Sequence, residues 1–416
     1  MEEKKIDSLK KELKLKQFQF NSIYEFSSSL YSSFDIDSII RIYFSTLMGQ
    51  MGISKTFFFD SENNLFRKRG FKLSKDELEV FFKEIKKTED EIFYLKVDDL
   101  SEELDYIKNI LLSKQIHYLV NISESKKRKI VLGLGYKFNR IKLSSEDIEF
   151  SFFISRFASS AIDNAYMIEH IIESKRIEHE LKIARDIQLS LLPQKIPELK
   201  NFEISVIYKP INEIGGDYYD ILKERNSMIP VLIADVEGKG LSAALLAASS
   251  QAVFHSLNEL YFFKPEKFIS KANSLICDLT RGNRFITLVW MLVDDEKKSV
   301  TYVNAGHIEP LLISKSKVIR LSKGGFLTGY IGNAKYEKET IQLKKGDIIV
   351  AFTDGVPEVE NPNDEEFSIE AIIDFIKKNR KFSTKKMSEK LYKAIYNFSH
   401  GKKFRDDFTL IIIKVR

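Results

Sequence analysis

The chain has 416 residues, of which 44% are hydrophobic, and its 65 Lys and Arg residues against 60 Asp and Glu residues leave a formal net charge of +5. This length predicts two to three domains, and the interspersed charges form no basic block, which argues against a nucleic-acid partner. One cysteine, Cys277, excludes an intrachain disulfide framework. No apolar run approaches the roughly 18 to 20 residues that span a bilayer and no signal peptide opens the chain, so we expect a soluble, cytoplasmic protein with no membrane partner.

The N-terminal third is predicted to form a small α+β domain. Residues 1–19 alternate basic and acidic side chains, which is typical of a solvated helical extension. Residues 20–144 combine helical spacing of apolar positions with strand-like runs such as "KTFFFD" and "KIVLGLGYK". This layout, with "LSSEDIEF" opening a long closing helix, resembles a GAF sensory domain. The resemblance implies a sensory and dimerising role with an unknown ligand or activator, and no cyclic-nucleotide signature identifies that ligand.

Residues 145–195 are predicted to form a helical linker. Apolar residues step by three and four, the period of a coiled-coil seam, in two runs: Ile154, Phe157, Ala161, Ala165, Ile168 and Ile172, then Ile177, Leu181, Ala184 and Ile187. The shift between the runs is a discontinuity in the seam. The alternative is an amphipathic helix that packs on its own domain. Because a helix this long extends beyond one small domain, we expect a signal-carrying linker that forms a homodimer.

Residues 196–416 are predicted to form a second α+β domain, in which a hairpin carries two acids. Strand-like runs flank a polar loop at 225–227. If that loop has three residues, Asp217 pairs with Asp235 on one face of the sheet, whereas a two- or four-residue loop breaks this register. Two carboxylates about 4 Å apart repel by roughly 4 kcal/mol at an effective dielectric near 20, unless one is protonated or a cation lies between them.

Three further acids occupy similar positions. Asp354 follows a buried strand in "GDIIVAFTDGVPE", and Asp406 and Asp407 precede the last strand in "FRDDFTLIIIKV". Each alone could be an ordinary turn aspartate, but together they predict a metal site. Oxygen ligands suit Mg²⁺ or Mn²⁺, and the sequence offers no His or Cys set for zinc.

Six segments in order, "ARDIQLSLLPQKIP", "GGDYYD", "IADVEGKG", "NAGH", "FTDGVPE" and "DDFTLIII", resemble SpoIIE-type serine phosphatases of the metal-dependent protein phosphatase 2C-like (PPM) family. The resemblance covers about 184–416 and implies an α/β/β/α sandwich. It implies that Asp235 bridges two Mn²⁺ or Mg²⁺ ions and that the Val236 carbonyl supports one of them. Asp217 would lie on the first-metal side and Asp354 and Asp406 on the second-metal side, with Asp407 and Asp220 as further candidates.

The implied activity is hydrolysis of phosphoserine or phosphothreonine in a protein by a hydroxide held between two metals. The usual substrate of such enzymes is a small STAS-type anti-anti-sigma protein, and the N-terminal domain and linker would regulate the activity. The alternative is a degenerate phosphatase that serves as a scaffold, against which the retained, mutually repelling carboxylates argue. A diguanylate cyclase, suggested by "GGDYYD", would require an acid at Tyr218 and leaves "FTDG" unexplained.

Four residues near the expected site have other interpretations. Glu237 stands where the family often has Ser or Thr, and Pro357 stands where it often has Thr. His307 in "NAGH" is interpreted as a turn residue that supports the metal loop, in preference to a general acid. Lys239 is interpreted as a turn lysine, since a lone GKG lacks the rest of a phosphate-binding Walker pattern.

Overall fold

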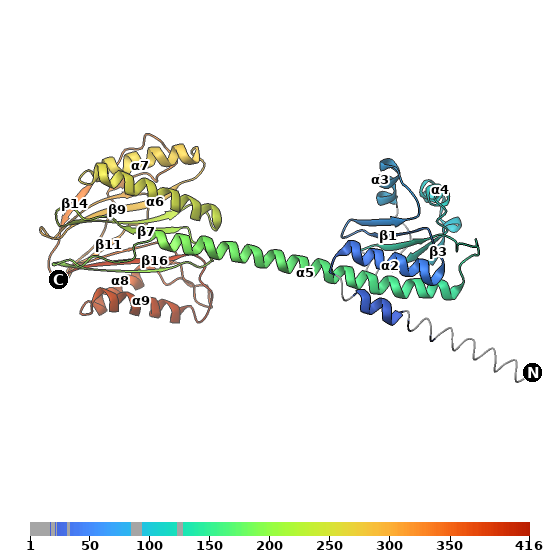
Figure 1. Ribbon diagram of the computed structural model, residues 1–416. Coiled ribbons are helices and arrows are strands. Elements are labelled where there is room, and N and C mark those ends of the chain that lie inside the picture. The colour runs from blue at the N-terminus through green and yellow to red at the C-terminus, as the bar shows by residue number, and fades with distance from the viewer. Residues whose placement is uncertain (1–16, 18–20, 22, 31–33, 85–93, 123–127) are drawn as a thin grey trace, which may run out of the picture. The chain divides into compact units, whose positions relative to one another are not determined.

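The computed structural model describes residues 17, 21, 23–30, 34–84, 94–122 and 128–416. The chain forms two compact units, which divide between Lys175 and Arg176 (Figure 1). The expected N-terminal extension, 1–19, lies outside the described residues except for Gln17. Within the described ranges, every helix is too short or too polar to cross a membrane.

The first unit is built on a five-stranded antiparallel sheet of order β2-β1-β5-β4-β3. Its strands are β1 (Thr56–Asp60), β2 (Leu65–Arg69), β3 (Tyr94–Lys96), β4 (Tyr118–Asn121) and β5 (Ile130–Leu134). Its helices are α2 (Ile36–Met51), α3 (Lys75–Glu84), α4 (Asp105–Ser113) and the first part of α5 (Ser145–Leu191), with short 3₁₀ turns η2 (Val97–Asp99) and η3 (Glu102–Leu104).

Helices cover both faces of this sheet, which explains why β1 is buried at every position and carries three consecutive phenylalanines. Phe58 faces the core formed with α2 and α5, whereas Phe57 and Phe59 face the core formed with α3 and α4 (Figure 1). A strand buried on both faces loses the usual alternation of polar and apolar residues.

Helix α5 buries two residues that were expected to lie in a coiled-coil seam. Ile154 is fully buried and Ala165 nearly so, and both belong to the core of the first unit. The seam is therefore wrong at these two positions, because α5 buries them against its own sheet. The large apolar side chains that α5 leaves exposed are Phe153, Phe157, Met167, Ile171, Ile172, Ile177, Ile183 and Ile187.

The second unit contains two sheets that pack face to face. The first has the order β13-β10-β9-β8-β7, with β14 paired to β10, and the second has the order β12-β11-β15-β16-β6. The strands are β6 (Phe202–Lys209), β7 (Asp217–Ile221), β8 (Met228–Val236), β9 (Ile286–Asp294), β10 (Ser299–Ala305), β11 (Leu311–Ile313), β12 (Val318–Arg320), β13 (Gly324–Gly325), β14 (Glu339–Gln342), β15 (Ile348–Phe352) and β16 (Phe408–Val415).

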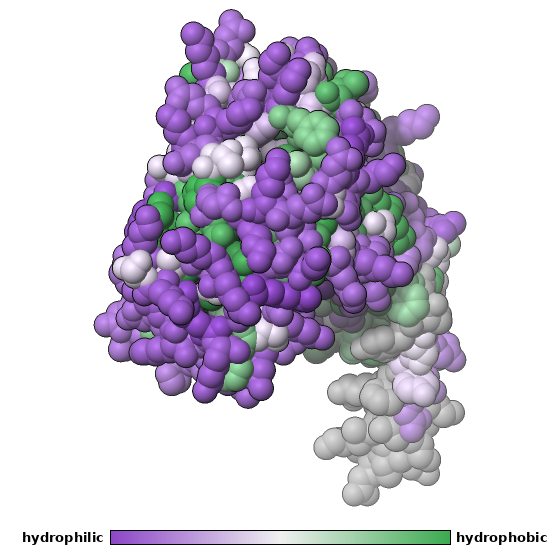
Figure 2. All heavy atoms as spheres, turned by 90° about the vertical axis from the view of Figure 1, so that its left-hand side faces the viewer, coloured by the Kyte–Doolittle hydropathy of each residue, from purple (hydrophilic) through white to green (hydrophobic). Residues whose placement is uncertain are grey.

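Helices cover the outer face of each sheet in the second unit. Helices α6 (Leu241–Tyr261) and α7 (Pro265–Thr280) lie on the first sheet, and α8 (Ile369–Asn379) and α9 (Thr384–Phe398) lie on the second (Figure 1). A third core fills the space between the sheets. The unit thus has the four layers expected, helix, sheet, sheet and helix. The face of this unit shown in Figure 2 is mainly hydrophilic, with hydrophobic side chains in small separate groups.

The β7–β8 hairpin has the predicted register but not the predicted loop. Asp217 pairs with Asp235, as expected. The turn contains two residues, Asn226 and Ser227, both with positive φ, as in the type I′ turns that favour hairpins. Arg225 and Met228 close this turn, and Leu222 already pairs with Pro230. Residues 223–224 therefore lie opposite a single residue, 229, and this bulge restores the register that a two-residue turn would break.

Candidate metal centre

The five expected acids come together from the strand ends of both sheets. Asp217 begins β7 and Asp235 is the second-last residue of β8, both in the first sheet. Asp354 follows β15, and Asp406 and Asp407 precede β16, both in the second sheet. Their charges act on one another: Asp354, Asp406 and Asp407 all raise the pKa of Asp235. The structure thus gathers the predicted carboxylates at one edge of the sandwich.

Asp217 is the most enclosed of these acids, with 3% of its surface exposed. Burial, followed by the charge of Asp235, raises the pKa of Asp217 well above its usual range. Its Oδ2 accepts hydrogen bonds from the hydroxyls of Thr353, at 2.7 Å, and of Thr409. Both threonines belong to the second sheet or its edge, so Asp217 joins the two sheets. These threonines were missed in the sequence, although each lies within two residues of an expected acid.

The pKa values of Asp235 and Asp354 are both raised, as expected for partly buried carboxylates that lie close to other negative charges. Burial, then the charges of Asp354 and Asp406, raise the pKa of Asp235 to about 7. Burial, then the charge of Asp406, raises the pKa of Asp354. Because desolvation and like charges both disfavour an ionised carboxylate, a cation placed among these groups would stabilise them.

Asp407 binds the backbone that leads into β7. Its Oδ1 accepts from the Ile211 amide at 2.8 Å and its Oδ2 accepts from the Gly216 amide at 2.6 Å. Gly215 lies so close that a Cβ there would be 2.6 Å from Asp407 Oδ2 and 2.7 Å from the Tyr208 hydroxyl. Asp407 therefore shapes the segment before Asp217, and a side chain at position 215 would displace Asp407 or Tyr208.

Asp406 is paired with the lysine of the loop that follows Asp235. The Lys239 ammonium lies 2.6 Å from Asp406 Oδ2 and 2.9 Å from the Arg405 carbonyl. The hydrogen bond to Asp406 is the main reason why the pKa of Lys239 is raised. Lys239 thus places a positive charge at the edge of the acidic cluster, a role that the turn-lysine interpretation did not include.

The rest of that loop packs on the turn before β9. Val236 ends β8, and its carbonyl oxygen would lie 3.2 Å from a Cβ at Gly216. The Glu237 amide donates to the Phe285 carbonyl at 3.0 Å, and Glu237 Oε2 accepts from the Phe285 amide at 3.3 Å. Glu237 therefore fastens the loop to the β9 turn, which accounts for an acid that the sequence left unexplained.

His307 is a buried, neutral residue beneath the cluster. Burial lowers the pKa of His307 to about 4. Its Nδ1 lies 2.8 Å from the hydroxyl of Thr287, and Thr287 is the β9 residue opposite Asp235. The His307 amide donates to Asn304 Oδ1 at 2.9 Å. An imidazole that is neutral and enclosed at neutral pH is suited to supporting the strands, in agreement with its interpretation as a structural histidine.

Asp220 does not belong to the cluster. It is nearly fully buried, but it alternates with Asp217 along β7 and faces α6. Its Oδ2 accepts from the Tyr218 hydroxyl and lies 2.7 Å from Nε2 of His255 on α6. The candidate role of Asp220 as a metal ligand is therefore wrong, because the pleat directs this carboxylate to the helix side.

The cluster suits a hard divalent cation in its chemistry. Within the described residues, no three His, Cys, Asp or Glu side chains are already arranged as a coordination set. Asp217 accepts hydrogen bonds from threonines, and Asp406 pairs with Lys239. All the donors are nonetheless carboxylate or carbonyl oxygens, the ligands that Mg²⁺ and Mn²⁺ prefer. Burial and then the charges of the neighbouring acids raise the pKa of Asp235, and such an ion would relieve the repulsion among these acids.

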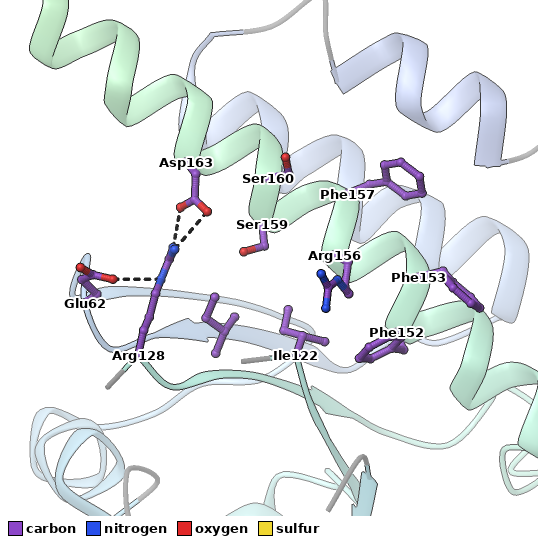
Figure 3. Close-up of a pocket in the computed structure, with 11 residues that line it drawn as sticks. Glu62, Ile122, Arg128, Phe152, Phe153, Arg156, Phe157, Ser159, Ser160 and Asp163 are labelled. Carbon is purple, nitrogen blue, oxygen red and sulfur yellow. Dashed lines mark hydrogen bonds and ion pairs between the residues drawn. The ribbon is translucent and has the colours of Figure 1, made fainter. Parts of the chain in front are cut away.

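A second candidate site is a cavity of about 900 Å³ in the first unit, between the sheet and α5 (Figure 3). Phe152, Phe153 and Phe157 of α5 supply aromatic surface. Arg128 binds Asp163 of α5 at 2.5 Å and the fully buried Asp60 of β1, which ties the helix to the sheet beside the cavity. Of these residues, the sequence singled out only Phe157, as part of the expected coiled-coil seam and not of a cavity.

Comparison with known proteins gives the class of the second unit. Two facing sheets between helix layers, with aspartates at one edge, form the fold of PP2C-type domains. The SiaA PP2C domain of Pseudomonas aeruginosa has this fold, with a TM-score of 0.53 and 19% identity over 58% of this chain and 98% of that one.

The sequence comparisons narrow this class to a family. Residues 227–416 match the family described as Stage II sporulation protein E (SpoIIE). The chain is 30% identical to the phosphoserine phosphatase RsbU of Bacillus subtilis over 245 residues, which is 58% of this chain and 71% of RsbU. It is 24% identical to the phosphoserine phosphatase RsbP of the same organism, over 43% of this chain and 45% of RsbP. The chain belongs to the SpoIIE family of PP2C-type protein serine/threonine phosphatases, which are metal-dependent.

Proposed function

We propose that the second unit removes the phosphoryl group from phosphoserine or phosphothreonine in a protein substrate, with two Mn²⁺ or Mg²⁺ ions as cofactors. The observation that carries this proposal is the pairing of buried Asp217 with Asp235 across the β7–β8 hairpin. When bound, two such ions would provide a hydroxide for in-line attack and would neutralise charge on the phosphoryl oxygens.

The residues proposed to hold the ions are Asp217, Asp235, Asp354 and Asp406, with the Val236 carbonyl and Asp407 in support. Asp217 is oriented by Thr353 and Thr409, which fix one of its oxygens. Asp407 orients the backbone before Asp217 through the Ile211 and Gly216 amides. Lys239 stabilises the charge of Asp406 at the edge of the cluster and would move from this oxygen when an ion takes its place.

The proposed substrate is a small STAS-type phosphoprotein within a partner-switching pathway. The support for a phosphoprotein is that two relatives, RsbU and RsbP, are phosphoserine phosphatases. The STAS assignment follows from the resemblance to the family and from no residue of this chain alone.

Regulation is proposed to reach the phosphatase part, 196–416, from a GAF-like sensory domain, 20–144, through a helical linker, 145–195. The exposed apolar residues that belong to the expected seam, Phe157, Ile172, Ile177 and Ile187, support a homodimer formed along the linker, since large apolar side chains are normally buried in a contact. The cavity beside Arg128 and Asp163 is the proposed place for an activating ligand, because a ligand there would contact α5 directly.

The decisive experiment is hydrolysis of an aryl phosphate and of a phosphoserine peptide by the full chain in Mn²⁺. We expect turnover that EDTA abolishes and that Asp235→Asn and Asp354→Asn each reduce to background. A phosphorylated STAS protein should be hydrolysed faster than either small substrate. Absence of turnover with all three substrates would favour the scaffold alternative.

A further inference from the structure

The last turns of α5 reach the segment that carries Asp217 into the cluster. Gln188 of α5 has only 8% of its surface exposed. Its Nε2 donates to the Gly215 carbonyl at 2.7 Å, and its Oε1 accepts from the Gly215 amide at 3.2 Å. One side-chain amide therefore binds both polar groups of a single residue, as a neighbouring strand would.

Gln188 and Asp407 hold this segment at adjacent residues. Asp407 accepts from the amide of Gly216, the next residue, and also makes a longer contact of 3.5 Å with the amide of Asp217. A side chain at Gly215 would collide with Asp407. The backbone directly before Asp217 is thus fixed by a carboxylate of the β16 edge and by an amide of α5.

The contact is anchored on the helix side as well. Leu192 is buried in the core between α6, α7 and the first sheet, and Leu189 packs against that core. Arg185 forms an ion pair with Glu213 at 3.3 Å, one helical turn before Gln188. A buried side-chain amide that lost its partners would incur a large desolvation cost, so Gln188 and Gly215 are expected to move together.

We propose that Gln188 is a positioning residue for Asp217, so that the end of the linker helix forms part of the metal site. The inference rests on the proposed function, because it assigns to Gln188 the placement of a carboxylate that would bind a cation. It gives the "ARDIQLSLLPQKIP" segment a role at the site. A displacement of α5 would then change the position of Asp217 without any change in the acidic residues.

The chain offers a matched control in the same segment. Gln194 is also a glutamine with two hydrogen bonds to backbone, but its Nε2 donates to the carbonyls of Leu189 and Leu192 at the helix end, at 3.1 and 3.0 Å. A purely structural role for glutamine at the end of α5 would make Gln188→Leu and Gln194→Leu behave alike.

The experiment compares full-length wild type, Gln188→Leu, Gln188→Asn and Gln194→Leu. The melting temperature and the hydrolysis of an aryl phosphate are each measured over a Mn²⁺ titration. Loss of an orienting partner of a metal ligand typically weakens metal binding by about 10- to 100-fold. We expect the half-saturating Mn²⁺ concentration to rise at least about tenfold in both Gln188 variants, and to stay within about twofold of wild type in Gln194→Leu.

Gln188→Asn keeps the amide but shortens its reach, so it tests position when the leucine variant does not fold. Metal-free melting temperatures report any loss of fold separately from metal binding. One outcome would overturn this inference and leave the proposed function intact. In that outcome the wild type responds to Mn²⁺, and the folded Gln188 variants have the same half-saturating Mn²⁺ concentration as the wild type. A wild-type protein with neither turnover nor a melting shift in Mn²⁺ would overturn both.

Discussion

Asp217 lies directly opposite Asp235 on adjacent antiparallel strands, and both side chains are on the face that points into the sandwich. Their neighbours on that face, Tyr219 and Ile233, form part of the core between the two sheets. Two acids on a core face destabilise the metal-free fold, and this relationship leads to the first prediction.

Added Mn²⁺ should raise the melting temperature of the second unit in the full-length protein. A ligand that binds only the folded state at 100 times its dissociation constant stabilises that state by about 2.7 kcal/mol. The shift should be absent in Asp235→Asn, which removes the charge that the cation balances. Calorimetry with and without millimolar Mn²⁺ measures the shift in melting temperature of both proteins. An equal shift in wild type and Asp235→Asn would show that the metal acts elsewhere.

The stability of the metal-free protein should fall as pH rises through the range in which Asp235 ionises. Its pKa is raised from 3.8 to about 7, first by burial and then by the charges of Asp354 and Asp406. An acid whose pKa is higher in the folded state contributes stability that is fully present below its pKa in the unfolded state. This stability is lost as the pH rises through its pKa in the folded state. Since one pKa unit corresponds to about 1.4 kcal/mol, the contribution of Asp235 to the free energy of unfolding is on the order of 4 kcal/mol.

Urea unfolding of wild type and Asp235→Asn between pH 4 and pH 8, both with EDTA, checks this pH dependence. We expect Asp235→Asn to gain stability relative to wild type as pH rises, because asparagine cannot ionise. Parallel curves for the two proteins over this range would contradict the raised pKa of Asp235.

Replacement of Lys239 by methionine should tighten metal binding. Lys239 competes with any cation for Asp406 Oδ2, which lies 2.6 Å from its ammonium. An exposed ion pair is worth up to about 1 kcal/mol, so half-saturating Mn²⁺ should fall by up to about fivefold. The control is Lys402→Met, since Lys402 pairs with Glu360 outside the cluster. A higher Mn²⁺ requirement in Lys239→Met would refute the competition.

The homodimer should depend on the exposed apolar residues of α5. Ile172 and Ile177 of the expected seam are 63% and 48% exposed, and a paired helix would cover them. Light scattering of the full chain should give a dimer, and Ile172→Glu with Ile177→Glu should give a monomer, because each change buries a charge in the pair. Lys182→Glu alters charge on the same helix without removing an apolar residue and serves as the control. A monomeric wild type at micromolar concentration would reject the dimer.

Much of the site was predictable because charges at strand ends leave a clear pattern. The Asp217–Asp235 register followed from alternation along the strands, and it survived an incorrect loop length only because residues 223–224 form a bulge. Alternation also shows why Asp220 faces α6, although the sequence motif groups it with Asp217.

Contacts between distant segments were not predictable in the same way. The hydrogen bonds of Thr353 and Thr409 to Asp217 join residues 136 and 192 positions apart. Ile154 has the spacing of a coiled-coil seam, but the same spacing also fits a helix packed on its own sheet, and the core of the first unit decides between them. Periodicity in the sequence identifies an apolar face of a helix, but it does not show which element packs against that face.

The bond between Asp220 and His255 has a consequence for the motions of α6. His255 is fastened to β7 in the C-terminal half of this helix. At the other end, Gly240 provides no side-chain cap, the first turn contains no acid, and Leu241 and Leu245 are exposed. The two ends of α6 are therefore held unequally. In a hydrogen-exchange time course the amides of the first turns, which adjoin the metal loop, should exchange well before those around His255. His255→Phe should narrow that difference by speeding exchange in the C-terminal half.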